Sequence, residues 1–241
     1  MKKDSLFEQR KNNVMNFDFG KETAAVFDDM LSRSVPLYEE LQRMMGEIAD
    51  EFAQDDTNIY DLGCSTGITL HTMNNAVSKK VKLIGVDYSE PMLEKCRSMF
   101  KKEKRFKECD LLCADLNDGI TLNNASVVIL NLTLQFIRPL YRDKLIKSIH
   151  EGLNEKGCLI LIEKVLGDNS TFNSMFIKYY YQMKKRNGYS ELEIARKREA
   201  LENVLIPYRL SENKELLKRN GFSSVDIFYK WYNFCGMVAI K

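Results

Sequence analysis

IYDLGCSTG, residues 59–67, is the stretch that decides the fold of this chain. Apolar residues that run into a turn with two glycines indicate a strand ending in a loop, because glycine lets the backbone approach a ligand where a Cβ would collide. A second unit, LIGVDYS at 83–89, follows after a helix-length gap and carries Asp87. Asp87 lies 20 positions after Gly67, where α/β nucleoside-binding units place the acid that holds ribose hydroxyls. The two units predict a site for a nucleoside-containing cofactor.

The spacing of the glycines distinguishes between cofactors. A dinucleotide site uses G-x-G-x-x-G to hold pyrophosphate, whereas this chain has Gly63-x-x-x-Gly67. That pattern favours S-adenosylmethionine, which has no phosphate, and Asp61 is placed to accept from its ammonium group directly or through water. Asp115 follows a third expected strand and is a carboxylate for the adenine amino group. One glycine turn alone fits a plain strand-to-helix connection equally well, but three elements in this order do not.

Composition sets limits on the class of protein. The chain has 241 residues, of which 44% are hydrophobic and 29% charged, which is ordinary globular usage. A net charge of +2 makes no case for binding to nucleic acid or to a membrane. The six cysteines and two histidines have no metal-ligand spacing, so no metal is expected. No signal peptide is recognisable and no apolar run is long enough to span a bilayer, so we expect a cytoplasmic protein with free thiols.

The alternation of expected elements predicts an α/β fold, with a doubly wound, mostly parallel sheet in a single domain over residues 1–241. We expect N-terminal helices over 1–54, including one that starts at Ser34-Val35-Pro36 and runs to about Phe52. A cofactor-binding core over 55–167, a helical insert over 168–212 and a final part over 213–241 follow. The expected strands are 57–62, 81–86, 105–110, 126–130, 157–163, 225–232 and 235–240, and the expected helices of the core are 67–77, 90–101 and 139–153.

Four groups of residues fall at the carboxyl ends of the expected strands, where such sheets bind ligands. They are Gly63–Ser65, Asp87, Asp115 and Asn131. Asn131 directly follows the apolar run at 127–130, and its alternative role is that of a turn residue satisfying local backbone groups. The three other groups at the same edge favour a role for Asn131 in the site.

The insert contains one arginine with an unusual expected position. Ser190-Glu191-Leu192-Glu193 forms a capping box that opens a helix. Along that helix Ile194, Arg198, Leu201 and Leu205 share one stripe, so Arg198 is expected on the apolar face. A buried guanidinium needs a partner, and its planar fork suits a carboxylate. Two interpretations stay open: an internal ion pair or a side chain that reaches to water, and an anion-binding arginine that faces the cofactor.

The ordinary methyltransferase machinery is not recognisable. The turn after the fourth strand, NLTLQF at 131–136, lacks the prolines used for methylation of exocyclic amines. This turn, with NGYSELEI at 187–194, Lys197-Arg198 and LENV at 201–204, resembles the carboxy-S-adenosyl-L-methionine synthase family. The likeness runs over almost the whole chain, and the NGYSELEI segment and the NLTLQF turn are its most specific parts.

The resemblance implies a fold like that of class I S-adenosylmethionine-dependent methyltransferases, with a Rossmann-like core. It implies that prephenate supplies carbon dioxide to the methyl carbon of S-adenosylmethionine, which gives carboxy-S-adenosylmethionine and phenylpyruvate. The product is the carboxymethyl donor for the tRNA wobble uridine, so a downstream tRNA carboxymethyltransferase is an implied partner, without direct binding of nucleic acid by this chain. The family is homodimeric, and the 168–212 insert is a plausible interface.

The resemblance also implies roles for individual residues. It assigns cofactor contacts to Tyr38, Gly63, Cys64, Ser65, Asp87, Tyr88, Asp115, Leu116 and Asn131. Arg198 pairs with the new carboxylate and is the implied catalytic residue, from its own subunit or from a neighbour. Tyr88 departs from the asparagine that is usual in the family, which weakens that single assignment.

Two other functions are compatible with the residues. A true methyltransferase acting on tRNA or a small molecule would produce S-adenosylhomocysteine and leave Arg198 without a role. A non-catalytic protein that carries carboxy-S-adenosylmethionine to a tRNA enzyme would bind tightly without turnover.

Overall fold

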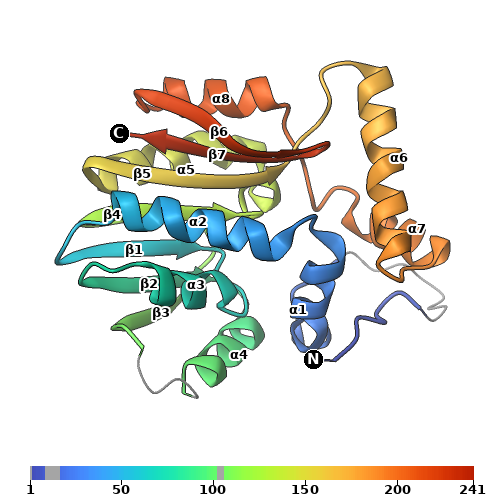
Figure 1. Ribbon diagram of the computed structural model, residues 1–241, viewed down its shortest axis with the longest axis horizontal. Coiled ribbons are helices and arrows are strands. Elements are labelled where there is room, and N and C mark those ends of the chain that lie inside the picture. Colours follow the sequence, from blue (N-terminus) through green and yellow to red (C-terminus); the bar gives the residue numbers. More distant parts are fainter. Residues whose placement is uncertain (1, 9–16, 102–105) are drawn as a thin grey trace.

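The computed structural model describes residues 2–8, 17–101 and 106–241. They form a seven-stranded sheet with the order β3-β2-β1-β4-β5-β7-β6. Strands β1 to β5 pair in parallel, whereas β7 runs antiparallel between β5 and β6 (Figure 1). The strands are β1 (Thr57–Leu62), β2 (Val81–Asp87), β3 (Cys109–Cys113), β4 (Ala125–Asn131), β5 (Leu153–Lys164), β6 (Ser224–Trp231) and β7 (Phe234–Ile240). This arrangement is the predicted α/β fold with a mostly parallel, doubly wound sheet.

Helices cover both faces of the sheet, and three others lie beyond the carboxyl ends of the parallel strands. Figure 1 shows α2 and α3 in front of the sheet, α5 and α8 behind it, and α1, α6 and α7 past the strand ends. The helices are α1 (Lys21–Ser34), α2 (Tyr38–Phe52), α3 (Ile68–Ala76), α4 (Glu90–Phe100), η1 (Leu134–Phe136), α5 (Pro139–Gly152), α6 (Ser170–Arg186), α7 (Glu191–Leu201) and α8 (Leu210–Arg219). The three outer helices therefore stand where such sheets bind ligands.

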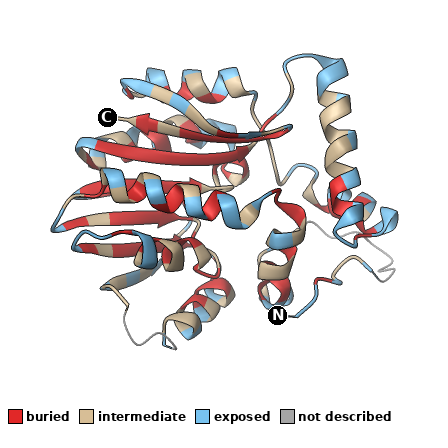
Figure 2. Ribbon diagram, in the orientation of Figure 1, coloured by how far each residue is buried: buried red, intermediate tan, exposed pale blue. Residues whose placement is uncertain are grey.

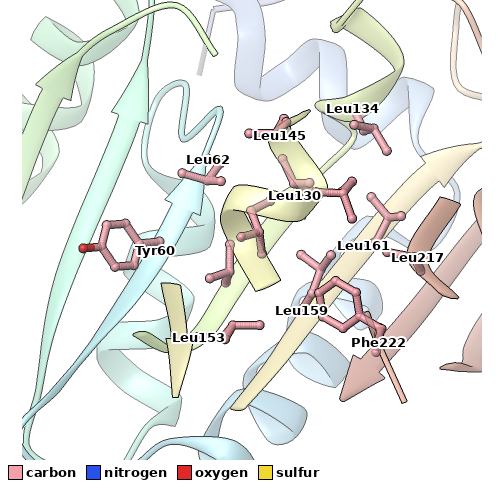
Figure 3. Close-up of a cluster of buried hydrophobic side chains, with 14 of the residues drawn as sticks. Tyr60, Leu62, Leu130, Leu134, Leu145, Leu153, Leu159, Leu161, Leu217 and Phe222 are labelled. Atoms are coloured by element: carbon pink, nitrogen blue, oxygen red, sulfur yellow. The ribbon is translucent and has the colours of Figure 1, made fainter. Parts of the chain in front are cut away.

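The central strands are buried on both faces, so their side chains divide between two cores. Tyr60, Leu62 and Leu130 point into the core beneath α5 and α8, which Figure 3 shows, whereas Ile59 and Ile129 pack against α2 and α3. This alternation follows from the two-residue period of a strand. Figure 2 shows the central strands mostly buried. Burying one such aliphatic side chain contributes about 1.5–3 kcal/mol, so the two cores hold the strand ends in fixed positions.

The start of the second helix differs from the prediction. Ser34 is the last residue of α1, and α2 begins only at Tyr38, after Leu37 in a left-handed conformation with φ 52°. The expected capping role of Ser34 and the expected first turn at Pro36 are therefore wrong. Pro36 lies in the connection instead, where its carbonyl accepts a hydrogen bond from the Tyr229 hydroxyl at 2.8 Å. The connection is thereby tied to β6, and Tyr38 is placed at a helix N-terminus.

Other boundaries also differ from the prediction, and β5 begins at Leu153 rather than at 157. The strand expected at 105–110 is β3, which begins at Cys109, and Arg105 lies outside the described residues. Of the expected N-terminal helical region, residues 1 and 9–16 lie outside the described residues, and 2–8 form no helix. The capping box at Ser190 and Glu193 is confirmed. In the described ranges, no helix has the length and apolar character needed to cross a membrane.

Candidate active site

A cavity of about 320 Å³ opens at the carboxyl ends of the parallel strands. Its wall is built from α1, the β1–α3 turn, the ends of β2, β4 and β5, and helices α6 and α7. The structure brings together at this wall all the expected contact residues except Arg198, namely Tyr38, Gly63, Cys64, Ser65, Asp87, Tyr88, Asp115, Leu116 and Asn131. Residues far apart in the sequence meet here because parallel strands all end at the same edge.

The glycine turn is held in shape by its neighbours. Gly63 has φ 86°, and a Cβ at this position would lie 2.4 Å from the Thr133 hydroxyl oxygen. The backbone N–H of Ser65 donates to Asp87 Oδ2 at 2.9 Å, and the N–H of Ser89 donates to Asp87 Oδ1 at 2.8 Å. Burial nevertheless raises the pKa of Asp87. The carboxylate is thus fixed by two backbone donors and retains acceptor capacity for ligand hydroxyls.

Asp61 is a buried carboxyl group without a hydrogen-bond donor among the described residues. Asp61 is 1% exposed, and neither of its carboxyl oxygens accepts a hydrogen bond from the described part of the chain. Burial, and then the charge of Asp87, raise the pKa of Asp61 to about 8. A buried anion of this kind is stabilised by a nearby cation. Asp61 stands two residues before the cavity-lining Gly63, so a ligand ammonium group at the turn fits this requirement.

Asn131 and Asp115 differ in how much of their hydrogen-bonding capacity the protein uses. Asn131 Nδ2 donates to Thr69 Oγ1 at 3.1 Å, whereas its buried Oδ1 accepts from no described residue. Asp115 Oδ1 accepts from the backbone N–H and from Nδ2 of Asn117, both at 2.8 Å, which leaves Oδ2 to other partners. The neighbouring Leu116 is buried and supplies an apolar surface. A polar edge beside an apolar surface suits a purine ring.

Arg198 is the expected residue that the structure places elsewhere. It is exposed and does not line the cavity of its own chain. The buried stripe of α7 consists of Glu193, Ile194, Lys197 and Ala200, and the helix ends at Leu201, so Leu205 is not part of it. The prediction of a buried-face arginine is therefore wrong for the single chain, because the true stripe continues from Ile194 at i+3 rather than at i+4.

Two lysines that the sequence interpretation missed line the cavity instead. Lys197 comes from the buried face of α7, and Lys164 is the last residue of β5. Burial lowers the pKa of Lys164 to about 8 and that of Lys197 to about 7. Lys164 carries the same signal that revealed Asp87 and Asn131, a polar residue at the end of a buried strand. Lys197 had no comparable signal, because its burial depends on how α7 packs.

The arrangement fits a ligand with a cationic amino-acid end and a nucleoside end. The unpartnered Asp61 lies at the glycine turn, Asp87 follows at the end of β2, and Asp115 and Leu116 follow at the end of β3. The order along the sheet is thus ammonium site, ribose site and adenine site, which matches S-adenosylmethionine. Among the described residues, no group of three or more His, Cys, Asp or Glu is arranged to hold a metal ion.

Comparison with known proteins agrees with this fit. A family model described as a methyltransferase domain matches residues 59–157. A carboxy-S-adenosyl-L-methionine synthase from Methylococcus capsulatus is 55% identical over 242 residues, covering 100% of both chains. A protein of the same name from Desulforapulum autotrophicum is 45% identical and covers 100% of this chain and 98% of its own. The similarity therefore extends over all the elements described above.

Solved structures of methyltransferases share the fold at much lower identity. Human N-acetylserotonin methyltransferase in complex with S-adenosylmethionine has a TM-score of 0.60 at 14% identity, covering 91% of this chain and 55% of its own. The cyclopropane synthase MmaA2 from Mycobacterium tuberculosis has a TM-score of 0.55 at 14% identity, covering 82% and 67%. At these identities the likeness shows the fold of S-adenosylmethionine-dependent methyltransferases and nothing about substrates.

Proposed function

The chain belongs to the carboxy-S-adenosyl-L-methionine synthase family, and from this premise we propose that it makes carboxy-S-adenosylmethionine from S-adenosylmethionine and prephenate. The observation that carries the proposal is the full-length identity of 55% to a synthase of that name. It is supported by the cavity, whose acidic turn and strand ends fit S-adenosylmethionine.

The proposed reaction balances without an external oxidant or reductant. Prephenate loses its ring carboxylate as carbon dioxide and its hydroxyl as hydroxide, and the ring becomes aromatic in phenylpyruvate. The positive sulfur of S-adenosylmethionine makes its methyl C–H bonds acidic, so one proton leaves to the hydroxide as water and the methyl carbon bonds to carbon dioxide. Aromatisation drives the release, and hydroxide from the substrate serves as the base, so the protein supplies binding and orientation.

The residues of this chain have separate tasks in the proposal. Asp61 attracts the ammonium group of S-adenosylmethionine, and Asp87 accepts from its ribose hydroxyls. Asp115 and Leu116 hold the adenine. Burial raises the pKa of Tyr38, so its phenol stays protonated and serves as a hydrogen-bond donor at neutral pH. The aromatic and aliphatic remainder of the wall excludes water, which protects a carbanionic carbon from protonation.

Arg198 retains its proposed role only if a second copy of the chain brings it to the cavity. On its own chain it is exposed, and the nearest cavity-lining residue of α7 is Lys197. The insert that carries it displays exposed apolar side chains, Phe172 at 56% and Leu192 at 53% exposure. Figure 2 shows α6 largely intermediate or exposed. We therefore propose a homodimer through this insert, in which Arg198 of one subunit pairs with the carboxylate formed in the other.

The product has a defined use in this proposal. A carboxymethyl group on a sulfonium is a donor for alkylation, so a tRNA carboxymethyltransferase that modifies the wobble uridine is the consumer. A net charge of +2 provides little reason for this chain to bind tRNA itself. Six free cysteines suit a reducing cytoplasm, which is where we place the enzyme.

The test is incubation of purified protein with S-adenosylmethionine and prephenate, followed by mass spectrometry of the small molecules. The proposal predicts phenylpyruvate together with a species heavier than S-adenosylmethionine by one carbon dioxide. S-adenosylhomocysteine without any prephenate-dependent product would instead indicate a methyltransferase. Tight binding of carboxy-S-adenosylmethionine without turnover would indicate a carrier.

A further inference from the structure

The cavity is divided by charge. Its acidic part lies at the ends of β2 and β3, where Asp87 and Asp115 line it. Asp61 lies nearby in β1, two residues before Gly63 of the cavity wall. Its basic part lies at the end of β5 and on α7, where Lys164 and Lys197 line it. In the sheet order β3-β2-β1-β4-β5, strand β5 stands two strands from β1, which is roughly 10 Å at the usual strand spacing. The lysines therefore lie on the side away from the expected ribose and adenine positions.

Lys197 is buried and Lys164 is half-buried, and neither pairs with a carboxylate of the described residues. Lys197 Nζ donates to the Ser34 hydroxyl at 3.4 Å, and Lys164 Nζ lies 4.9 Å from the centre of the Tyr180 ring. Within the described ranges neither forms a salt bridge. Buried lysines are rare unless they are paired, because transfer of an ammonium group from water is costly. An anion in the cavity would remove this cost.

A further basic residue near Lys164 and Lys197 increases the stabilisation that a bound anion would provide. A third lysine, Lys184, is buried behind the wall, 5.6 Å from the Tyr180 ring and 5.1 Å from the Tyr189 ring. Its positive charge repels that of Lys197 and helps to lower the pKa of Lys197. Asp4 attracts both lysines, yet it accepts a hydrogen bond from the Tyr189 hydroxyl at 2.6 Å rather than pairing with either. Lys184 thus adds a third basic group behind the two lysines that line the cavity.

Glu193 compensates only for Lys184, and only through its charge. Its carboxylate attracts the Lys184 ammonium group. The two hydrogen bonds that Glu193 Oε2 accepts come from Ser190, from the backbone N–H at 2.8 Å and from the hydroxyl at 2.7 Å. The carboxylate is used by the capping box of α7. The two lysines that line the cavity, Lys164 and Lys197, are therefore left without an ion-pair partner among the described residues.

We infer that Lys164 and Lys197 bind a carboxylate of the second substrate, namely the side-chain carboxylate of prephenate that survives in phenylpyruvate. This inference rests on the proposed function and adds the residues that receive the carboxyl donor. Of the two carboxylates of prephenate, the one lost as carbon dioxide is poorly served by a cation, because an ion pair stabilises the anion and opposes its decarboxylation. The retained carboxylate keeps its charge throughout and gains from the lysines at every stage.

The same chemistry has another source, the carboxylate of S-adenosylmethionine, and the experiment separates the two. The test uses Lys197→Met and Lys164→Met, which keep the unbranched side chain up to the position of Cε and remove the charged amine. Lys185→Met is the matched control, because Lys185 is an exposed lysine of the neighbouring helix α6 and pairs with Glu191 at the surface. For each protein we would measure the KM for prephenate from steady-state turnover. Calorimetric titration would give the Kd for phenylpyruvate and the Kd for S-adenosylmethionine.

The inference predicts that each cavity variant raises the KM for prephenate and the Kd for phenylpyruvate at least tenfold, with the Kd for S-adenosylmethionine within twofold of wild type. Lys185→Met leaves all three unchanged. A prephenate KM within twofold of wild type in both cavity variants would overturn the inference. So would a loss confined to S-adenosylmethionine affinity, which would assign the lysines to the other carboxylate. Failure of the wild-type protein to turn over prephenate would contradict the proposed function itself.

Discussion

Lys197 Nζ lies 3.4 Å from the hydroxyl oxygen of Ser34, which joins the middle of α7 to the last residue of α1. Both residues line the cavity, and both were expected in other roles or none. Through this contact α7 packs against α1 at the cavity, and the Lys197 amine lies in the cavity wall. The neighbouring Arg198 points to solvent and is free to serve a second subunit.

Asp61 should make the affinity for S-adenosylmethionine depend on pH. Burial raises its pKa to about 8 in the free protein, so at pH 7 its carboxyl is largely protonated, whereas ammonium binding requires the anion. Binding at pH 7 should therefore release a proton, and affinity should rise as pH increases toward 8. Calorimetry in buffers of different ionisation enthalpy measures the number of protons released.

The variant Asp61→Asn tests the same residue. Because the folded-state pKa of Asp61 is raised from 3.8 to about 8, the folded protein favours the neutral carboxyl, and stability is lost progressively as pH rises from about 4 to about 8. The amide variant should be at least as stable as wild type at pH 9 and should bind S-adenosylmethionine at least tenfold more weakly, without proton release. Proton release that persists in the variant would assign it to another group.

Gly63→Ala should destabilise the fold by about 1–3 kcal/mol, because it adds a close contact to an unfavourable φ of 86°. The new Cβ would lie 2.4 Å from the Thr133 hydroxyl oxygen. Gly188→Ala is the matched control, since it has φ 85° and its nearest neighbour, an Arg33 nitrogen, is 3.9 Å away. Thermal unfolding should show a larger loss at 63 than at 188, and Thr133→Ala should restore part of the difference. Equal losses would show that the contact is absent.

Arg142→Met should destabilise the protein by about 2–4 kcal/mol, because a fully buried guanidinium organises the cavity rim. Arg142 Nε donates to the Ile137 carbonyl at 2.9 Å, and its terminal nitrogen donates to the Ile206 carbonyl at 2.6 Å. At roughly 2–4 °C per kcal/mol, the melting temperature should fall by about 5–15 °C. Arg219→Met, which breaks an exposed pair with Asp143, should cost less than about 1 kcal/mol. A similar loss in both variants would remove the special role of Arg142.

Arg198→Leu should abolish carboxylation while the fold persists, since the side chain is exposed on its own chain. Asp87→Asn should disable the cofactor site of the chain that carries it. If Arg198 acts across a dimer, mixing the two inactive variants under exchange should restore about a quarter of wild-type activity. This follows because half the dimers are hybrids and each hybrid has one intact site. No recovery on mixing, with exchange verified by mass spectrometry, would place Arg198 in its own subunit or outside the mechanism.

The positions around the cavity were predictable because they depend on strands. A strand buried on both faces has a clear apolar run, and the first polar residue after it lies at the ligand edge, as for Asp87 and Asn131. Lys164 follows the same rule at the end of β5 and was overlooked. The sheet and its parallel core were confirmed for the same reason.

The positions on helices were harder to predict. From Ile194, the apolar stripe of α7 continues to Lys197 and not to Arg198, and the choice between i+3 and i+4 depends on how α7 packs against α6 and the end of α1. The stripe was also extended to Leu205, although α7 ends at Leu201. Ser34 and Pro36 carry a good helix-start signal, but Ser34 ends α1, and Pro36 lies in the connection, where its carbonyl accepts from the Tyr229 hydroxyl. Tertiary contacts of this kind are not encoded in local periodicity.

The most direct test of the account is the fate of the ring carboxylate of prephenate. Prephenate labelled with ¹³C at that carbon, incubated with S-adenosylmethionine and the purified protein, should give carboxy-S-adenosylmethionine that carries the label, together with unlabelled phenylpyruvate in equal amount. Product without label, or phenylpyruvate formed without any carboxylated S-adenosylmethionine, would contradict the claim that this cavity transfers carbon dioxide from one substrate to the other.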